Sequence, residues 1–183
     1  MDANSFLVLL DINGLLCSKI DKNHKLFENL LTVECNSNYS VLLRPNAGEF
    51  LTELSQHYTV GIYSSTTYVN ITKILTAISR DWKSYVSIIA DRSCTVLNPD
   101  FQNVPKIKSY DTVKLLTRIW EHPIHNCDRK WNKNNTLLID HEEEKLRFND
   151  PRNILIVEEF TISSETNITD LLPQIENKLA ELA

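Results

Sequence analysis

Short apolar runs alternate with amphipathic segments along this 183-residue chain, and this alternation restricts its fold more than any other feature. The apolar runs have the length of strands, whereas the segments between them carry apolar residues at helical spacing. Strands are expected at residues 6–10, 58–63, 85–90, 136–139 and 153–157, and helices at 47–57, 68–79, 111–120 and 168–182. This βαβ order predicts an α/β fold with a Rossmann-like parallel sheet of about five strands between flanking helices.

Two regions interrupt the alternation. Residues 31–35 and 40–43, on either side of Asn36-Ser37-Asn38, predict a small β-hairpin that could act as a flap over the end of the first strand. Residues 121–135 form a polar, Asn-rich insertion that is long enough to be mobile. No large cap domain is expected, and the length suits a single domain over residues 1–183.

The charge balance limits the classes of partner. A formal net charge of −5 and a pI near 5.5 argue against a general nucleic-acid binder, because no long Lys/Arg stripe is available to neutralise phosphates. No apolar stretch approaches the length of a membrane span, and the N-terminus lacks the features of a signal peptide. We therefore expect a soluble, cytoplasmic monomer with no direct membrane insertion.

The four cysteines are scattered without CxxC spacing, which favours reduced thiols over a disulfide framework. His122, His125 and Cys127 have a spacing that could ligate zinc. No matching second pair of ligands is evident, and the surroundings are rich in asparagine. This segment is therefore interpreted as an exposed loop.

The first apolar run ends in Asp11-Ile12-Asn13-Gly14. A buried strand that stops at an exposed acid and a glycine places a carboxylate at the carboxyl edge of the sheet, where open α/β folds bind their ligands. Asp140 follows a later apolar run in the same way. The alternative is that Asp11 opens an ordinary turn and that Asp140 caps a helix.

The order of several short motifs resembles the haloacid dehalogenase superfamily. The closest likeness is to the protein phosphatases related to the polymerase C-terminal-domain phosphatases, followed by the magnesium-dependent phosphotyrosine phosphatases. The motifs that carry this resemblance are Asp11-x-Asn13-Gly14-x-Leu16, Arg44-Pro45, the segment 60–65, Val113-Lys114 and the segment 137–140. The resemblance implies a haloacid dehalogenase fold and a phosphatase that uses Mg²⁺.

The resemblance also implies the chemical roles of individual residues. Asp11 would attack phosphorus to give an aspartyl phosphate, while Ser64 and Lys114 would contact the phosphoryl oxygens. Asp11, Asp140 and the main-chain carbonyl of Asn13 would hold Mg²⁺.

Some of these assignments have competitors in the sequence. Ser65 competes with Ser64, and Lys106 or Lys108 competes with Lys114, which could simply face solvent on its helix. Ser65 and Arg92 are candidates for substrate contact. The three consecutive carboxylates of residues 142–144 are interpreted as a solvated face, because they cannot all point at one ion.

Two positions depart from the pattern of the family. Asn13 stands where the family usually has a second aspartate, and an amide donates a hydrogen bond but does not transfer a proton. A phenol leaves more readily without protonation than an alcohol, so the substitution favours phosphotyrosine over phosphoserine or phosphothreonine. His141 stands where the family commonly has a second acid or amide, and its imidazole could act as a base near neutral pH.

These observations lead to one leading functional hypothesis and two alternatives. The leading hypothesis is a magnesium-dependent phosphatase that acts on a phosphorylated protein or peptide. A catalytically inactive family member that binds a peptide or phosphopeptide is one alternative, which Asn13 favours. A phosphatase of small metabolites is the other, since it would use the same residues behind a different entrance.

Overall fold

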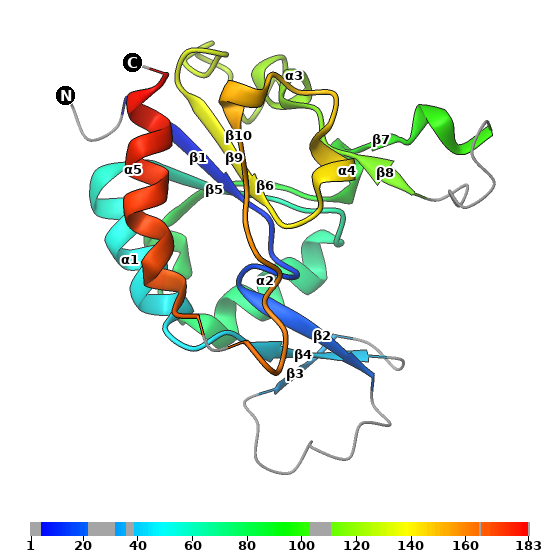
Figure 1. The fold of residues 1–183 in the computed structure, drawn as a ribbon, viewed down its shortest axis with the longest axis vertical. Helices are drawn as coiled ribbons and strands as arrows, with labels where there is room; N and C mark the ends of the chain where they lie inside the picture. The colour runs from blue at the N-terminus through cyan, green and yellow to red at the C-terminus, as the bar shows by residue number, and fades with distance from the viewer. Residues whose placement is uncertain (1–4, 22–31, 36–38, 103–110, 165, 183) are drawn as a thin grey trace.

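A five-stranded parallel sheet forms the centre of the computed structural model, which describes residues 5–21, 32–35, 39–102, 111–164 and 166–182 (Figure 1). The strand order is β10-β9-β1-β5-β6, so the first strand lies in the middle. The strands are β1 (Leu7–Leu10), β5 (Thr59–Tyr63), β6 (Val86–Ala90), β9 (Thr136–Asp140) and β10 (Ile154–Ile156). The predicted α/β class and its five strands are confirmed.

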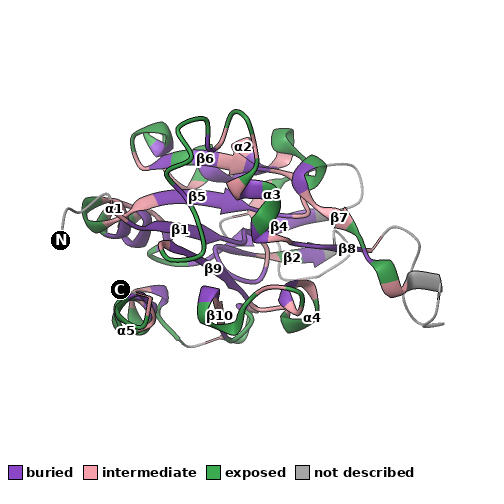
Figure 2. Ribbon diagram, turned by 90° about the horizontal axis from the view of Figure 1, so that it is seen from above, coloured by how far each residue is buried: buried purple, intermediate pink, exposed green. Residues whose placement is uncertain are grey.

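Successive side chains of a strand point to opposite faces of the sheet, and both faces of β1 are buried. Val8 and Leu10 of β1 belong to one core cluster, together with apolar residues of α1 (Ala47–His57), α2 (Tyr68–Ile78) and α5 (Leu172–Ala180). Leu7 and Leu9 belong to a second cluster with α3 (Leu116–Trp120) and Trp131. Figure 2 shows β1 and β9 buried along their length. This burial explains why these strands are continuous apolar runs in the sequence.

The predicted flap is a three-stranded antiparallel sheet of order β2-β4-β3. Its strands are β2 (Cys17–Asp21), β3 (Thr32–Glu34) and β4 (Tyr39–Leu43). The pairing of β3 with β4 confirms the expected hairpin, whose turn at residues 36–38 lies outside the described residues. The strand β2 was not expected, because its mixture of polar and apolar residues gave no clear strand signal.

The prediction of a helix at residues 111–120 is wrong for its first half. Residues Thr112–Val113 form β8, which pairs antiparallel with β7 (Val96–Leu97), and helix α3 begins only at Leu116. The main-chain amides between them are bound elsewhere: Lys114 N donates to Lys145 O at 2.9 Å, and Leu115 N donates to Tyr63 Oη at 3.2 Å. These long-range hydrogen bonds replace the helical ones.

The other expected helices are confirmed with ends shifted by a residue or a few. A 3₁₀ turn (Ile168–Leu171) leads into α5, with Pro173 in its first turn, as the closing pattern predicted. No helix in the described part of the chain is long and apolar enough to cross a membrane. The remaining helical pieces are short, namely α4 (Glu143–Leu146) and 3₁₀ turns at Trp82–Ser84, Arg92–Cys94, Pro99–Gln102 and Pro151–Asn153.

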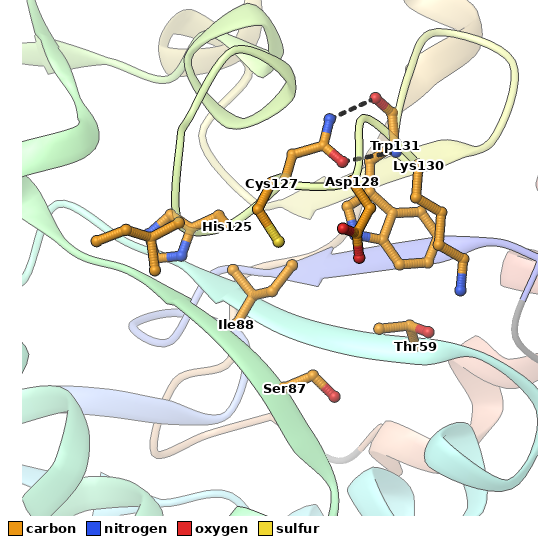
Figure 3. Close-up of a pocket in the computed structure, with 10 residues that line it drawn as sticks. Thr59, Ser87, Ile88, His125, Cys127, Asp128, Lys130 and Trp131 are labelled. Atoms are coloured by element: carbon orange, nitrogen blue, oxygen red, sulfur yellow. Dashed lines mark hydrogen bonds between the residues drawn. The ribbon is translucent and has the colours of Figure 1, made fainter.

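The insertion at residues 121–135 is organised around the buried side chain of Asn126. Its Nδ2 donates to the carbonyls of Trp120 and Trp131 at 2.8 and 2.9 Å, and its Oδ1 accepts from Trp131 N at 2.9 Å. Dashed lines in Figure 3 mark the two bonds to Trp131. This arrangement argues against the predicted mobility, because one amide satisfies three main-chain groups and holds Trp131 in the core.

Replacing Asn126 with alanine should therefore destabilise the protein. The change removes three hydrogen bonds, and each of the main-chain groups that water does not then reach costs about 1–3 kcal/mol. We expect Asn126→Ala to lower the free energy of unfolding by about 2–4 kcal/mol in urea titrations. The matched control is Asn134→Ala, at an exposed position of the same insertion. It should change stability by less than about 0.5 kcal/mol, and equal losses in the two variants would contradict this account.

Candidate active site

Asp11 and Asp140 lie next to each other at the carboxyl edge of the sheet. Asp11 follows β1, Asp140 ends β9, and the parallel register pairs Leu10 with Ile139. Lys114 Nζ lies between the two carboxylates, 2.8 Å from Asp11 Oδ1 and 2.6 Å from Asp140 Oδ2. The structure thus brings together three residues that the sequence had assigned to one site.

This trio is buried, which corrects the expectation that Asp11 is an exposed acid. Asp11 is 3% exposed, and Asp140 and Lys114 are fully buried. The two ion pairs account for this burial, because a buried carboxylate is tolerated when a cation faces it.

The protonation of the trio follows from burial and from mutual attraction. Burial raises the pKa of Asp11 above its usual value, although Lys114 opposes this effect. Burial acts in the same direction on Asp140, but Lys114 and other hydrogen-bond donors outweigh it and hold the pKa of Asp140 below its usual value. Burial disfavours the charged ammonium of Lys114, yet the two carboxylates raise its pKa overall. Lys114 therefore stays protonated, and Asp11 is the carboxylate whose charge is less firmly held.

Lys114 is positioned by its main chain, not by a helix. Its N–H donates to Lys145 O, as noted above, and its carbonyl accepts from Asn149 Nδ2 at 2.7 Å. The ring of Tyr63 lies with its centroid 6.0 Å from Lys114 Nζ. Lys114 therefore does not face solvent on a helix, which was the competing interpretation. The competing residues Lys106 and Lys108 lie outside the described residues.

The loop after Asp11 is held by contacts from distant segments. Gly14 has a φ of 73°, a conformation that favours glycine. Its carbonyl accepts from Phe160 N at 2.7 Å, and Arg44 Nη1 donates to Leu15 O at 3.2 Å. Arg44, part of the Arg44-Pro45 motif, thus fixes the main chain that follows Asp11.

Ser64 and Ser65 follow β5, the strand next to β1, and Arg92 follows the edge strand β6. Ser64 is buried, and its N–H donates to Ala90 O at 2.9 Å. Arg92 Nη1 donates to Ser65 O at 3.4 Å, and Thr112 Oγ1 donates to Ser65 Oγ at 3.1 Å. The structure thus places both serines in the loop after β5, with Arg92 in contact with Ser65.

The side chain of Asn13 is anchored by Thr66, a residue that the sequence analysis did not select. Asn13 Nδ2 donates to Thr66 Oγ1 at 2.8 Å, and Thr66 N donates to Ser64 Oγ at 3.4 Å. Thr66 thus links the loop after β1 to the loop after β5. The run of four hydroxyl residues at 64–67 was the available signal, since such side chains commonly bind neighbouring loops at strand ends.

The residues at this edge fit a divalent cation. Asp11, Asp140 and His141 each offer a ligand atom, and these atoms lie within 4.8 Å of one another. Carboxylate oxygens suit the hard cation Mg²⁺. His141 was considered in the sequence analysis only as a base, and its place in this group comes from the three-dimensional structure.

A second group of metal-type ligands contains Cys94, His122 and His125, whose ligand atoms also lie within 4.8 Å of one another. Cys127, which the sequence pattern had suggested, is exposed and does not belong to it. His122 Nδ1 accepts hydrogen bonds from Ile124 N and His125 N, both at 3.2 Å. The ring of His122 therefore carries its proton on Nε2 and has no free lone pair for a metal.

The second group borders a cavity that lies away from the carboxylates. The cavity has a volume of about 470 Å³ and is lined by Thr59, Ser87, His125 and Cys127, among others (Figure 3). Thr59 begins β5, whereas the candidate active site lies beyond the other end of that strand. All four cysteines are free thiols, as expected from their spacing.

The model of the family "NLI interacting factor-like phosphatase" matches residues 6–183. A protein of Schizosaccharomyces pombe, described as an uncharacterised FCP1 homology domain-containing protein, is 26% identical over 171 residues. That match covers 90% of this chain and 65% of the relative, so the chain spans slightly less than two thirds of the relative's length.

Two solved structures have a similar fold. One is Fcp1, described as an essential RNA polymerase II CTD phosphatase, with a TM-score of 0.57 and 14% identity; the match covers 98% of this chain and 49% of Fcp1. The other is a variant of the fission yeast RNA polymerase II CTD phosphatase Fcp1 bound to beryllium fluoride, with a TM-score of 0.56, 13% identity and coverages of 98% and 51%. These likenesses confirm the haloacid dehalogenase fold. Together with the family match over nearly the whole chain, they lead to one conclusion: the chain belongs to the NLI interacting factor-like phosphatase family.

Proposed function

We propose that this protein is a metal-dependent phosphatase of phosphorylated proteins or peptides that works through an aspartyl phosphate on Asp11. The observation that carries the proposal is the buried trio of Asp11, Lys114 and Asp140 at the carboxyl edge of β1 and β9. The family match supports a phosphatase, and the printed description of Fcp1 as a CTD phosphatase supports a phosphorylated protein as the class of substrate.

In the first step, an Asp11 oxygen attacks phosphorus, and the bond to the leaving oxygen breaks. Lys114 favours the ionised form of Asp11 and offsets negative charge on the phosphoryl group. Ser64, beyond the end of β5, would donate to a phosphoryl oxygen. In the second step, water attacks the acyl phosphate and releases inorganic phosphate and the Asp11 carboxylate.

A divalent cation, with Mg²⁺ as the ion that the family resemblance implies, would reduce the repulsion between Asp11 and the phosphate when it is bound. Asp11, Asp140 and the main-chain carbonyl of Asn13 are the residues that we propose to hold it. Asp140 adopts a suitable state, because its pKa is held below the usual value and its carboxylate is ionised at neutral pH.

Asn13 determines the substrate preference in this proposal. Its amide is bound to Thr66 Oγ1 and does not deliver a proton to the leaving oxygen. An aryl phosphate is less affected than an alkyl phosphate, because the phenol has a pKa of about 10 and departs readily as its anion. We therefore propose phosphotyrosine as the preferred substrate over phosphoserine and phosphothreonine.

The same observation supports a second candidate function. A site that lacks its proton donor could bind a phosphopeptide without turning it over. The measurements that follow separate this binding module from an enzyme.

Replacing Asp11 with asparagine should abolish hydrolysis of p-nitrophenyl phosphate in the presence of Mg²⁺. The amide cannot form the acyl phosphate, whereas the fold should change little because burial already disfavours the charge of Asp11. Thermal midpoints and steady-state rates, with and without EDTA, test both expectations. The control is Asp128→Asn, an exposed residue of the insertion that should leave turnover unchanged. Full activity in Asp11→Asn would rule out covalent catalysis by this residue.

Wild-type protein should hydrolyse a phosphotyrosine peptide faster than the matched phosphoserine peptide. Asn13→Asp should then raise phosphoserine turnover more than phosphotyrosine turnover, by about 10² if the new carboxylate is well placed. Thr66 favours that placement, because its hydroxyl can donate to a carboxylate as well as accept from an amide.

Steady-state kinetics of both proteins on both peptides distinguish the candidates. No turnover by either protein, combined with measurable binding of phosphopeptide, would replace the enzyme with the binding module. Equal wild-type rates on the two peptides would refute the argument from the leaving group.

A further inference from the structure

A second lysine, Lys145, lies beside the buried trio of Asp11, Lys114 and Asp140. It belongs to α4, the short helix after Asp140, which lies next to β8 (Figure 1). Its main-chain carbonyl accepts the hydrogen bond from Lys114 N at 2.9 Å, so the contact that positions Lys114 also fixes Lys145 near it. Lys114 is fully buried, whereas the side chain of Lys145 is 25% exposed. Lys145 is therefore the lysine of this pair that a molecule from solvent can reach.

The ammonium of Lys145 is directed toward the loop after Asp11 by its ion pair with Glu142. The Glu142 oxygen that accepts from Lys145 Nζ also lies 3.7 Å from His141 Nε2. The ring of His141 packs on Gly14, so closely that a Cβ added to this glycine would lie 2.4 Å from the ring atoms Cε1 and Nδ1. These contacts form a continuous path from Lys145 Nζ to the loop after Asp11.

The charge of Lys145 acts on Asp11, as this placement predicts. Burial raises the pKa of Asp11, and Lys114 and, more weakly, Lys145 oppose that effect. Lys114 binds both carboxylates of the trio, so two negative charges share one positive charge before any phosphate arrives. A phosphoryl group that approaches Asp11 brings further negative charge, which a second, partly exposed ammonium offsets.

The ion pair with Glu142 leaves donors of Lys145 available. An ammonium has three N–H donors, and Glu142 is the sole hydrogen-bond partner of this one among the residues that the structure describes. Lys145 Nζ can therefore hold Glu142 and an oxygen of a bound anion at once. Holding Glu142 also favours anion binding, because this partly exposed carboxylate would otherwise repel a phosphate at the same place.

We propose that Lys145 binds the phosphoryl group of the ligand at the entrance of the site and keeps its ion pair with Glu142 while it does so. Lys145 recruits the phosphate, whereas the buried Lys114 holds the carboxylates of Asp11 and Asp140 in place. This inference deepens the proposed function, on which it rests for a phosphorylated ligand. It applies to an enzyme and to a binding module alike, because the phosphate is bound before any turnover.

Isothermal titration with inorganic phosphate in the presence of Mg²⁺ tests the proposal without turnover. Lys145→Gln should weaken phosphate binding by about tenfold at low salt, whereas Lys145→Arg should keep most of the affinity because it keeps the charge. The difference between wild type and Lys145→Gln should shrink to less than about threefold in about 0.5 M NaCl, since salt screens an exposed charge. Both variants keep the main-chain carbonyl that binds Lys114 N, so the fold is retained.

The matched control is Lys178→Gln, which should leave phosphate affinity unchanged. Lys178 also pairs with a glutamate three residues away, Glu181, and its side chain is 21% exposed, but it belongs to α5, which contributes no residue to the candidate site. Phosphate binding of wild-type strength in Lys145→Gln, or an equal loss in Lys178→Gln, would overturn this inference alone. A wild-type protein that neither binds phosphate nor hydrolyses p-nitrophenyl phosphate would overturn it together with the proposed function.

Discussion

The ammonium of Lys114 between Asp11 and Asp140 is the interaction on which the site depends. Parallel strands β1 and β9 bring the two carboxylates to the same edge of the sheet, where burial and mutual repulsion would otherwise keep them from both ionising. A single fully buried cation 2.6 to 2.8 Å from both resolves the conflict. Removing the lysine from such a group commonly costs about 3–5 kcal/mol, because uncompensated carboxylate charge is left in the interior, whereas removing the charge of Asp11 still leaves Lys114 paired with Asp140.

Much of the fold around this trio serves to place Lys114. The lysine belongs to an extended stretch between β8 and α3, where its N–H and carbonyl bind Lys145 and Asn149. Tyr63 connects the same stretch to β5, since its hydroxyl accepts from Leu115 N and donates to Cys94 O. The segment around α4 therefore positions the cation, while β1 and β9 position the anions. Different parts of the core therefore hold the cation and the anions.

The sequence predicted the positions of the two carboxylates better than the positions of the residues that contact them. Asp11 and Asp140 could be located because each follows a run of residues buried on both faces, which is a local signal. The extended main chain around Lys114 could not be predicted in this way. A hydrogen bond from Leu115 to Tyr63, 52 residues away, replaces a helical turn that the local pattern favours. The contact of Asn13 with Thr66 and the packing of His141 on Gly14 are likewise long-range. Such contacts leave no periodicity in the sequence.

The buried charges of Asp11, Lys114 and Asp140 help to decide whether the site still carries out chemistry or has lost it. Replacing a buried ion group with apolar residues of similar volume is often neutral or stabilising, so stability alone gives a chain little reason to keep Asp11, Lys114 and Asp140 buried together. Asn13 and His141 differ from the pattern of the family, yet both are ordered by specific contacts, with Thr66 and with Gly14. A site that had lost its chemistry would not need to hold an amide in place or to pack an imidazole against the loop that carries Asp11. The combination therefore favours altered catalysis over simple loss of function.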